Sequence, residues 1–297
     1  SDVGSHAVVI TATDPSGATA TDSFTLVVSN ANDAPTVSST AITTATEDAV
    51  YTYTLTGADA DVGDTLTMSG TTVPSWLTFT ASTGVLTGTP TNDNVGTTGN
   101  AVVLTITDAA GESVTDSFTI TVANTNDAPS FSSSPVLTAQ EDDVYTYTAV
   151  GTDMDAGDTF TLGSSSVPSW LTFTASTGVL TGTPTNSDVG SHSVTLTVTD
   201  AAGATGTQTF TITVSNANDA PTVTSTAITS ATEDSVYTYT LTVSDADVGD
   251  TLTMAGTTVP SWLTFTASTG VLTGTPTNDE VGDHSVVLTV TDAAGES

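Results

Sequence analysis

Short runs in which apolar and polar residues alternate are the main pattern of this chain. In residues 50–56 the apolar positions Tyr51, Tyr53 and Leu55 are separated by threonines. A later run places Val102, Leu104 and Ile106 on one face in the same way. This two-residue period is typical of a β-strand with one buried face, and threonine suits the exposed face because its β-branched side chain packs well on a pleated surface.

Residues that favour turns separate these runs at short intervals. Gly57, Gly63, Pro74, Gly84 and Pro90 fall within one stretch of the chain. A further run places Phe118, Ile120 and Val122 on an inward face, and no run has the 3.6-residue period of a helix. Many short strands with frequent turns predict an all-β fold made of β-sandwiches of the immunoglobulin type.

The pattern repeats along the chain, and internal repeats define the domain organisation. The motif Asn-Asp-Ala-Pro ends at Pro35, Pro129 and Pro221, which are 94 and 92 residues apart. The extra two residues lie at Thr97-Thr98, which we expect to be in a loop. A longer segment that begins Pro-Ser-Trp-Leu-Thr-Phe recurs unchanged from Pro74, Pro168 and Pro260. Such near identity indicates tandem duplication.

The repeat predicts four domains or parts of domains in a linear array. Residues 1–33 correspond to the C-terminal part of a repeat, residues 34–127 and 128–219 to full repeats, and residues 220–297 to a repeat without its last strand. Residues 1–19 and 279–297 cover the same part of the period. We therefore expect the sequence to be a segment of a longer array.

The charge is extreme and excludes several partners. Among 297 residues there are 33 acidic residues and no lysine or arginine, for a formal net charge of −33. Nucleic acids and anionic membrane surfaces are excluded as partners, because binding either one needs basic side chains. No apolar stretch approaches the 18 residues of a membrane span, so we expect no direct membrane insertion. There is no cysteine, and therefore no disulfide.

Four acidic motifs recur at fixed offsets in each repeat. They are Thr-Glu-Asp (Gln-Glu-Asp at Glu141), Asp-x-Asp-x-Gly-Asp, Thr-Asp-Ala-Ala-Gly and Asn-x-Asn-Asp-Ala-Pro. Carboxylate and amide oxygens without thiols suit Ca²⁺, which takes six to eight oxygen ligands in flexible geometry. The third acid of the second motif, Asp64, Asp158 or Asp250, is either a ligand or a turn residue that bonds its own backbone. Acidic residues outside the motifs, such as Asp116, are expected to be solvated, as is Asp48 inside the first motif.

In this order and spacing, the motifs resemble the cadherin repeat, and more closely its bacterial and dystroglycan-type relatives. The segment Ser-Thr-Gly-Val-Leu-Thr-Gly-Thr-Pro resembles the signature of the putative-Ig repeats of large bacterial surface adhesins. The resemblance covers the whole chain. It implies Ca²⁺ between consecutive domains, about two and at most three ions per junction, with ligands from the earlier domain, the linker and the later domain.

Position by position, the resemblance implies a ligand set at each linker. At the linker near residue 33 the set is Asn30, Asn32, Asp33, Asp59, Asp61 and Asp108. At the linker near residue 127 it is Glu47, Asn124, Asn126, Asp127, Asp153, Asp155 and Asp200. At the linker near residue 219 it is Glu141, Asn216, Asn218, Asp219, Asp245, Asp247 and Asp292. The Asp-Arg-Glu motif of cadherins is absent, and Asp93 and Asp188 stand near its position as substitutes.

These features predict a structural protein and not an enzyme. Our first hypothesis is a segment of a long extracellular protein of a bacterial cell surface, rigidified by Ca²⁺, that acts as the stalk or fibre of an adhesin or filament. Its partners would be adjacent repeats of the same chain. The alternative is that the repeats themselves bind cell-surface glycans or other copies, for cell–cell or biofilm adhesion. Trp76, Trp170 and Trp262 could stack on sugars, although we expect them to pack against the core.

Overall fold

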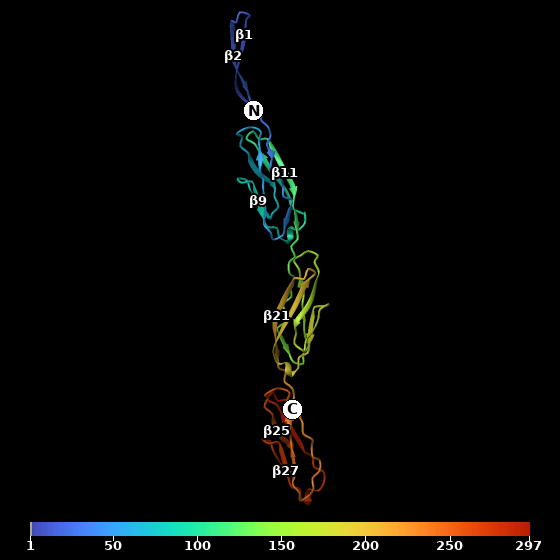
Figure 1. Ribbon diagram of the computed structural model, residues 1–297. Helices are drawn as coiled ribbons and strands as arrows, with labels where there is room; N and C mark the ends of the chain where they lie inside the picture. Colours follow the sequence, from blue (N-terminus) through green and yellow to red (C-terminus); the bar gives the residue numbers. More distant parts are fainter. Residues whose placement is uncertain (1) are drawn as a thin grey trace. The chain divides into compact units, whose positions relative to one another are not determined.

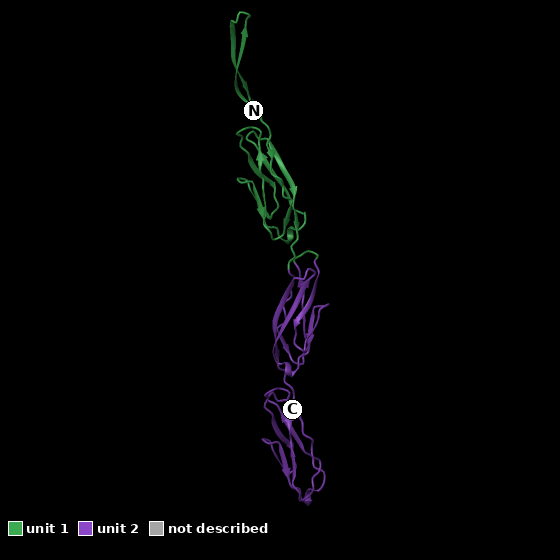
Figure 2. Ribbon diagram, in the orientation of Figure 1, with its two compact units in different colours: residues 1–127, 154–157 green, residues 128–153, 158–297 purple. Residues whose placement is uncertain are grey.

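The computed structural model describes residues 2–297. These residues form strands and three single 3-10 turns, η1 (Asn92–Asn94), η2 (Asn186–Asp188) and η3 (Asn278–Glu280), with no α-helix among them. They divide into two compact units, residues 1–127 with 154–157 and residues 128–153 with 158–297 (Figure 2). Immunoglobulin-like sandwiches in tandem make up the chain, so the all-β prediction is confirmed.

The first unit contains an N-terminal hairpin and one sandwich (Figure 1). The hairpin pairs β1 (Gly4–Thr13) with β2 (Thr19–Val28) in antiparallel fashion. One sheet of the sandwich has the order β11 (Ser113–Thr119), β10 (Ala101–Thr107), β7 (Thr67–Thr72), and another the order β5 (Tyr51–Thr54), β9 (Val85–Gly88), β8 (Leu77–Thr80). Two small pairs complete it, β12 (Thr121–Ala123) parallel to β4 (Thr44–Thr46) and β3 (Thr36–Val37) antiparallel to β6 (Gly57–Ala58).

The second unit contains two further sandwiches. In the first of them, the sheet order is β14 (Thr138–Gln140), β21 (Thr205–Ser215), β20 (Gly190–Asp200), β17 (Phe160–Ser166). The facing sheet has the order β15 (Tyr145–Thr148), β19 (Val179–Gly182), β18 (Thr172–Thr174), and β13 (Ser130–Phe131) pairs with β16 (Gly151–Thr152). The other sandwich has β23 (Tyr237–Thr240), β27 (Val271–Gly274), β26 (Leu263–Thr266) in one sheet, with the pairs β25 (Thr253–Thr258)–β28 (Val287–Thr291) and β22 (Thr222–Val223)–β24 (Val243–Ser244).

The alternating residues fill the cores as the sequence predicts. Tyr51, Tyr53 and Leu55 are buried together with the inward side chains of β10 and β12. The three tryptophans pack against these cores and each makes an edge-on contact with a core tyrosine, as Trp76 does with Tyr51. The two-residue insertion at Thr97-Thr98 lies in a turn between η1 and β10, as expected.

The third sandwich has a smaller core than the other two. Its buried apolar cluster consists of Tyr239, Leu241, Leu263 and Leu272. Within residues 2–297, no strand follows β28, so this sandwich has no counterpart of β21.

Candidate metal site

The linker at residues 216–219 is held by acidic side chains of the sandwiches before and after it. The backbone N–H of Ala217 donates to Oε1 of Glu141 at 2.8 Å. The N–H of Asp219 donates to Oδ2 of Asp247 at 2.8 Å, and Nδ2 of Asn218 donates to Oδ2 of Asp292 at 2.8 Å. Carboxylates on both sides of the linker thus converge on a few residues of extended backbone.

Two of these carboxylates are buried and have an oxygen that receives no hydrogen bond. Glu141 is 1% exposed and its Oε2 has no partner, while Asp247 is 8% exposed and its Oδ1 has none. Glu141, Asp219 and Asp247 each offer an oxygen within 4.8 Å of the others. Burying unpaired carboxylate oxygens side by side is costly, and a cation offsets that cost. The donor set, all oxygen and anionic, fits a Ca²⁺ ion.

A second acidic group lies in the later sandwich beside the same linker. Asp245, Asp250 and Asp292 offer oxygens that lie within 4.8 Å of one another. The hydrogen bond from Asn218 lowers the pKa of Asp292, and the backbone N–H groups of Gly295 and Glu296 also donate to its carboxylate. Asp292 is therefore anionic at neutral pH, and Oδ2 of Asp245 has no hydrogen-bond partner.

The same local arrangement occurs in the first unit. Asn32 donates to Asp108 at 3.0 Å and the N–H of Asp33 donates to Asp61 at 2.8 Å. Asp59, Asp64 and Asp108 form an acidic group of the kind just described. The bond from Asn32 lowers the pKa of Asp108, as the equivalent bond does for Asp292.

Near the end of the first unit, the buried Glu47 accepts a hydrogen bond from the N–H of Thr125 at 3.1 Å, and its Oε1 has no partner. Glu47, Asp48 and Asp127 form an acidic group. Asp155 accepts from Nδ2 of Asn124 at 2.9 Å and from the N–H of Asp127 at 2.8 Å. In the second unit, Asp153, Asp158 and Asp200 form the corresponding group.

Some candidate ligands lie outside these groups. Asp93 is exposed on η1, and the carboxylate of Asp188 caps η2 by accepting from the N–H of Thr185 at 2.9 Å. The side chains that reach the linkers from these turns belong to their neighbours Asn92 and Asn186, which donate to Asp127 and Asp219. Of the linker asparagines, Asn126 and Asn216 donate to the next carbonyl group of the chain, and Asn30 is exposed.

The structure also adds residues that the resemblance did not supply. An acidic group in each sandwich includes the third aspartate of the second motif, which is Asp64, Asp158 or Asp250. The carboxylate of each of these residues also accepts a hydrogen bond from the backbone N–H of the next residue. Asp48 is exposed, as expected, and one of its oxygens also lies in the group with Glu47. Asp116, also expected to be solvated, instead accepts a 2.6 Å hydrogen bond from the hydroxyl of Tyr53.

Fold and acidic linkers together define a protein of tandem immunoglobulin-like β-sandwiches. The chain belongs to the family described as "Putative Ig domain", whose model matches residues 34–123, 128–215 and 220–297. It is 33% identical over 155 residues to the serine-rich adhesin for platelets of Staphylococcus aureus, and 32% identical over the same length to that adhesin in strain MRSA252. Each match covers 50% of this chain. It spans 6% of the length of the first adhesin and 10% of the length of the second.

Solved cadherin structures share the fold. The protocadherin GammaB4 extracellular domain superposes with a TM-score of 0.53 at 21% identity, over 99% of this chain and 54% of that one. Mouse cadherin-23 EC22-24 gives a TM-score of 0.50 at 17% identity, over 90% of this chain and 95% of that one. Among residues 2–297, none of the helical turns has the length and apolar character needed to cross a membrane.

Proposed function

We propose that this chain is a Ca²⁺-rigidified segment of an extracellular repeat protein that serves as the stalk or fibre of a bacterial surface adhesin. The observation that carries the proposal is the buried, unpartnered Oε2 of Glu141 beside Asp219 and Asp247. A spacer that held linker atoms only by hydrogen bonds would have no need for such an oxygen. The similarity to a staphylococcal adhesin supports the cell-surface setting.

Two acidic groups beside the 216–219 linker support two ions there, and at most three. One group centres on Glu141, the other on Asp292. Ions present at about 100 times their dissociation constant add about 2.7 kcal/mol of stability per site. This contribution is large compared with a domain stability of about 5–15 kcal/mol. Because the ions bind at the linker, their binding would determine whether the linker is stiff. The repeated motifs extend the proposal to the linkers near residues 33 and 127.

A passive, structural role is favoured over binding by the repeats or catalysis. The tryptophans that could stack on sugars pack against the cores instead. In the three sandwiches the exposed strand positions are mostly threonine, and among residues 2–297 the one exposed aromatic side chain is Phe24 of the hairpin. Binding of glycans or of other copies by the repeats is the alternative hypothesis.

Ca²⁺ titration combined with small-angle scattering tests the proposal. We expect calorimetry to show Ca²⁺ binding, thermal melts to show stabilisation by Ca²⁺, and scattering to show a stiffer particle in Ca²⁺ than in excess chelator. A scattering profile and melting temperature that do not change on chelation would show that the acidic motifs are hydrogen-bonded turns and that the fold alone is shared with cadherins.

A further inference from the structure

The second sandwich begins and ends with two segments that run side by side in the same direction. β14 pairs in parallel with the end of β21, so that Thr138 lies opposite Thr213 and Gln140 lies opposite Ser215. Just before β14, the carbonyl group of Leu137 accepts a 2.9 Å hydrogen bond from the N–H of Thr213. A short parallel ladder therefore joins the start of the sandwich to its last strand.

The contact extends back to the point where the chain enters the sandwich. Gly206, near the start of β21, lies so close to Pro129 that a Cβ atom would overlap the proline carbonyl oxygen. Further along, Nε2 of Gln208 donates to the carbonyl group of Ser133 at 2.7 Å. Residues 129–140 thus follow β21 from its beginning to its end. The chain enters the sandwich at one end of this strand and leaves it at the other.

Because of this arrangement, tension along the chain would load the contact in shear. A pull on the two linkers draws residues 129–140 back toward the entry point and draws β21 forward toward residues 216–219. The ladder hydrogen bonds lie across the direction of the pull. They must all yield together before the two segments can slide past each other. If the segments were instead separated from one end, the same bonds would break one at a time and at a lower force.

The buried Glu141 continues the ladder past the end of β14. Its N–H donates to the carbonyl group of Ser215 at 3.0 Å, and its side-chain Oε1 accepts from the N–H of Ala217 at 2.8 Å. In a regular parallel ladder the backbone carbonyl group of Glu141 would accept this second bond. The carboxylate takes its place, so the ladder extends into the first residues of the linker.

The first sandwich has the same arrangement in its own residues. β4 pairs in parallel with β12, and the N–H of Thr121 donates to the carbonyl group of Thr43 at 2.8 Å. The N–H of Glu47 donates to the carbonyl group of Ala123 at 2.9 Å, and the N–H of Thr125 donates to Oε2 of Glu47 at 3.1 Å. A buried glutamate that extends a parallel ladder into the linker is therefore a feature of the repeat.

We propose that the first and second sandwiches are load-bearing modules that resist tension in shear. In the second sandwich the mechanical clamp is the contact of residues 129–141 with β21, and the side chain of Glu141 supplies its last hydrogen bond. The function is to transmit a pull along the array while the sandwiches stay folded. Every contact of the clamp joins protein groups, so this inference does not depend on the proposed Ca²⁺ sites.

Constant-force spectroscopy tests the clamp, because the chain has no cysteine and introduced cysteines choose the points of attachment. Ala128→Cys with Ala220→Cys pulls the second sandwich between its linkers. Asp143→Cys with Ala220→Cys pulls apart the adjacent ends of the clamp, so that its bonds break in sequence. In excess chelator we expect unfolding to be at least about a hundredfold slower in the first direction at the same force. A release of roughly 300 Å of chain identifies the event in that direction.

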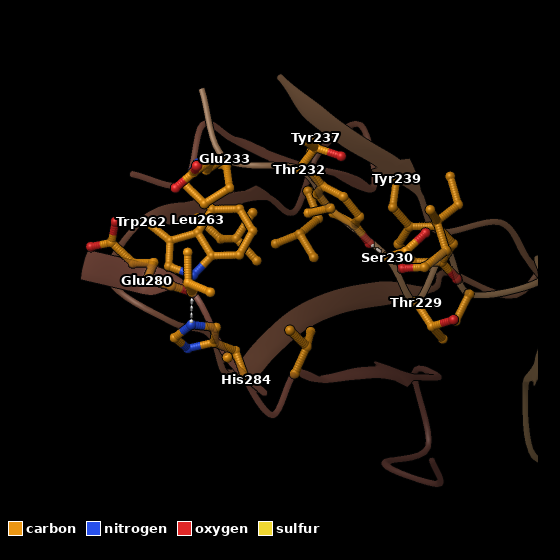
Figure 3. A pocket seen from close by; sticks show the side chains of 18 of the residues that line it. Thr229, Ser230, Thr232, Glu233, Tyr237, Tyr239, Trp262, Leu263, Glu280 and His284 are labelled. Carbon is orange, nitrogen blue, oxygen red and sulfur yellow. Dashed lines mark hydrogen bonds between the residues drawn. The ribbon is translucent and has the colours of Figure 1, made fainter. Parts of the chain in front are cut away.

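Substitutions at Glu141 test its part in the clamp. In the shear direction, Glu141→Ala is expected to speed unfolding at a given force by about tenfold, because a hydrogen bond to a charged group is lost. Glu141→Gln keeps an oxygen for the N–H of Ala217 and is expected to preserve the lifetime. In the other direction Glu141→Ala is expected to have little effect, because the bond it removes is the first to break. Glu233→Ala is the matched control, since Glu233 is exposed and lies outside the stretched segment (Figure 3).

Two outcomes would overturn the proposal. One is equal lifetimes in the two pulling directions, and the other is a second sandwich that unfolds in chelator without applied force, which circular dichroism would show. An equal effect of Glu141→Ala in both directions would show that the glutamate stabilises the fold without belonging to the clamp. Adding Ca²⁺ tests the ion sites separately. If Ca²⁺ lengthens no lifetime, the proposed sites are contradicted and the clamp is not.

Discussion

The backbone N–H of Ala217 donates a 2.8 Å hydrogen bond to one oxygen of Glu141, while the other oxygen of that buried carboxylate has no hydrogen-bond partner. The pairing ties the linker to the sandwich that precedes it. It also leaves a negative oxygen directed at the acidic group formed with Asp219 and Asp247. One oxygen thus has a structural role in the linker, and the other is available to a cation.

The substitution Glu141→Gln separates these two roles. Glutamine keeps an oxygen for the Ala217 N–H but removes the charge. In chelator we expect the melting temperature to stay the same or rise, because repulsion among buried carboxylates is relieved. In saturating Ca²⁺ we expect the variant to lose about 2–3 kcal/mol of the ion-linked stabilisation. Thermal melts with and without Ca²⁺, followed by calorimetric titration, measure both effects.

Glu233→Gln is the matched control for this substitution. Glu233 holds the equivalent position in the third sandwich but is exposed. In the 297-residue chain, its replacement is expected to leave Ca²⁺ binding and the melting temperature unchanged. Equal effects of the two substitutions would show that the ion responds only to overall charge and not to the buried site.

A buried asparagine supports the tryptophan of the first sandwich alone. The indole N–H of Trp76 donates to Oδ1 of Asn100 at 2.9 Å, and Nδ2 of Asn100 donates to the carbonyl groups of Asn94 and Gly96. Asn100→Ala leaves these buried groups unpaired, and we expect it to cost about 2–4 kcal/mol. Chemical denaturation followed by tryptophan fluorescence measures the loss.

The control for Asn100 comes from the second sandwich. There the rings of Trp170 and His192 pack edge-on, with their centroids 5.8 Å apart. The indole nitrogen of Trp170 has no hydrogen-bond partner. His192→Ala removes this ring contact and the 2.6 Å hydrogen bond between Nε2 of His192 and the carbonyl oxygen of Asp188, but it creates no new unpaired indole group. A smaller loss is therefore expected. A loss at His192 equal to that at Asn100 would contradict the importance we give to the asparagine hydrogen bonds.

The strands and the cores could be predicted because they depend on local alternation. Tyr51, Tyr53 and Leu55 follow each other at a period of two, and that period alone decides which face is buried. The grouping of Asp59 with Asp108 could be predicted only through the resemblance, since 49 residues of chain separate them.

Two features could not be predicted because they depend on backbone geometry or on contacts distant in sequence. The residue of Pro-Thr-Asn-Asp that reaches the linker is Asn92, because the 3-10 turn directs this side chain toward Asp127 and leaves Asp93 exposed. The hydrogen bond from Tyr53 to Asp116 joins strands 63 residues apart, and no local pattern indicates it. The recurrence of Pro-Thr-Asn in all three sandwiches is the sequence feature that could have pointed to Asn92.

The glycine of the repeated Gly-Thr-Pro segment is needed because another part of the backbone lies against it. Gly182 in β19 lies so close to Trp170 that a Cβ atom would overlap the tryptophan carbonyl oxygen. In Gly182→Ala, the backbone at residue 182 or the backbone at Trp170 must move. We expect the free energy of unfolding to fall by about 3 kcal/mol. Denaturant unfolding of the variant measures it. Gly163→Ala is the control, because its Cβ would meet only the movable hydroxyl of Thr197. A tolerated Gly182→Ala would show that the two segments can separate freely.

The buried tyrosines predict a loss of stability in alkali. Burial, followed by the hydrogen bond to Asp116, raises the pKa of Tyr53 to about 12, and burial raises the pKa of Tyr51 to about 12 as well. An unfolded tyrosine titrates near about 10. Between these values the folded chain binds more protons than the unfolded chain, so stability is fully present below about pH 10 and falls as the pH rises toward about 12.

The substitution Asp116→Gln is expected to change the pH range over which stability is lost in alkali. Glutamine, which the second sandwich carries at the equivalent Gln208, still accepts from the tyrosine hydroxyl but bears no charge. We expect the pKa of Tyr53 to fall while staying above its ordinary value, because burial remains. Difference absorbance of tyrosinate during a pH titration reports the change. Asp22→Gln, on the exposed β2, is the control and is expected to leave the titration unaltered. An unchanged Tyr53 titration in Asp116→Gln would mean that burial alone determines the pKa of this tyrosine.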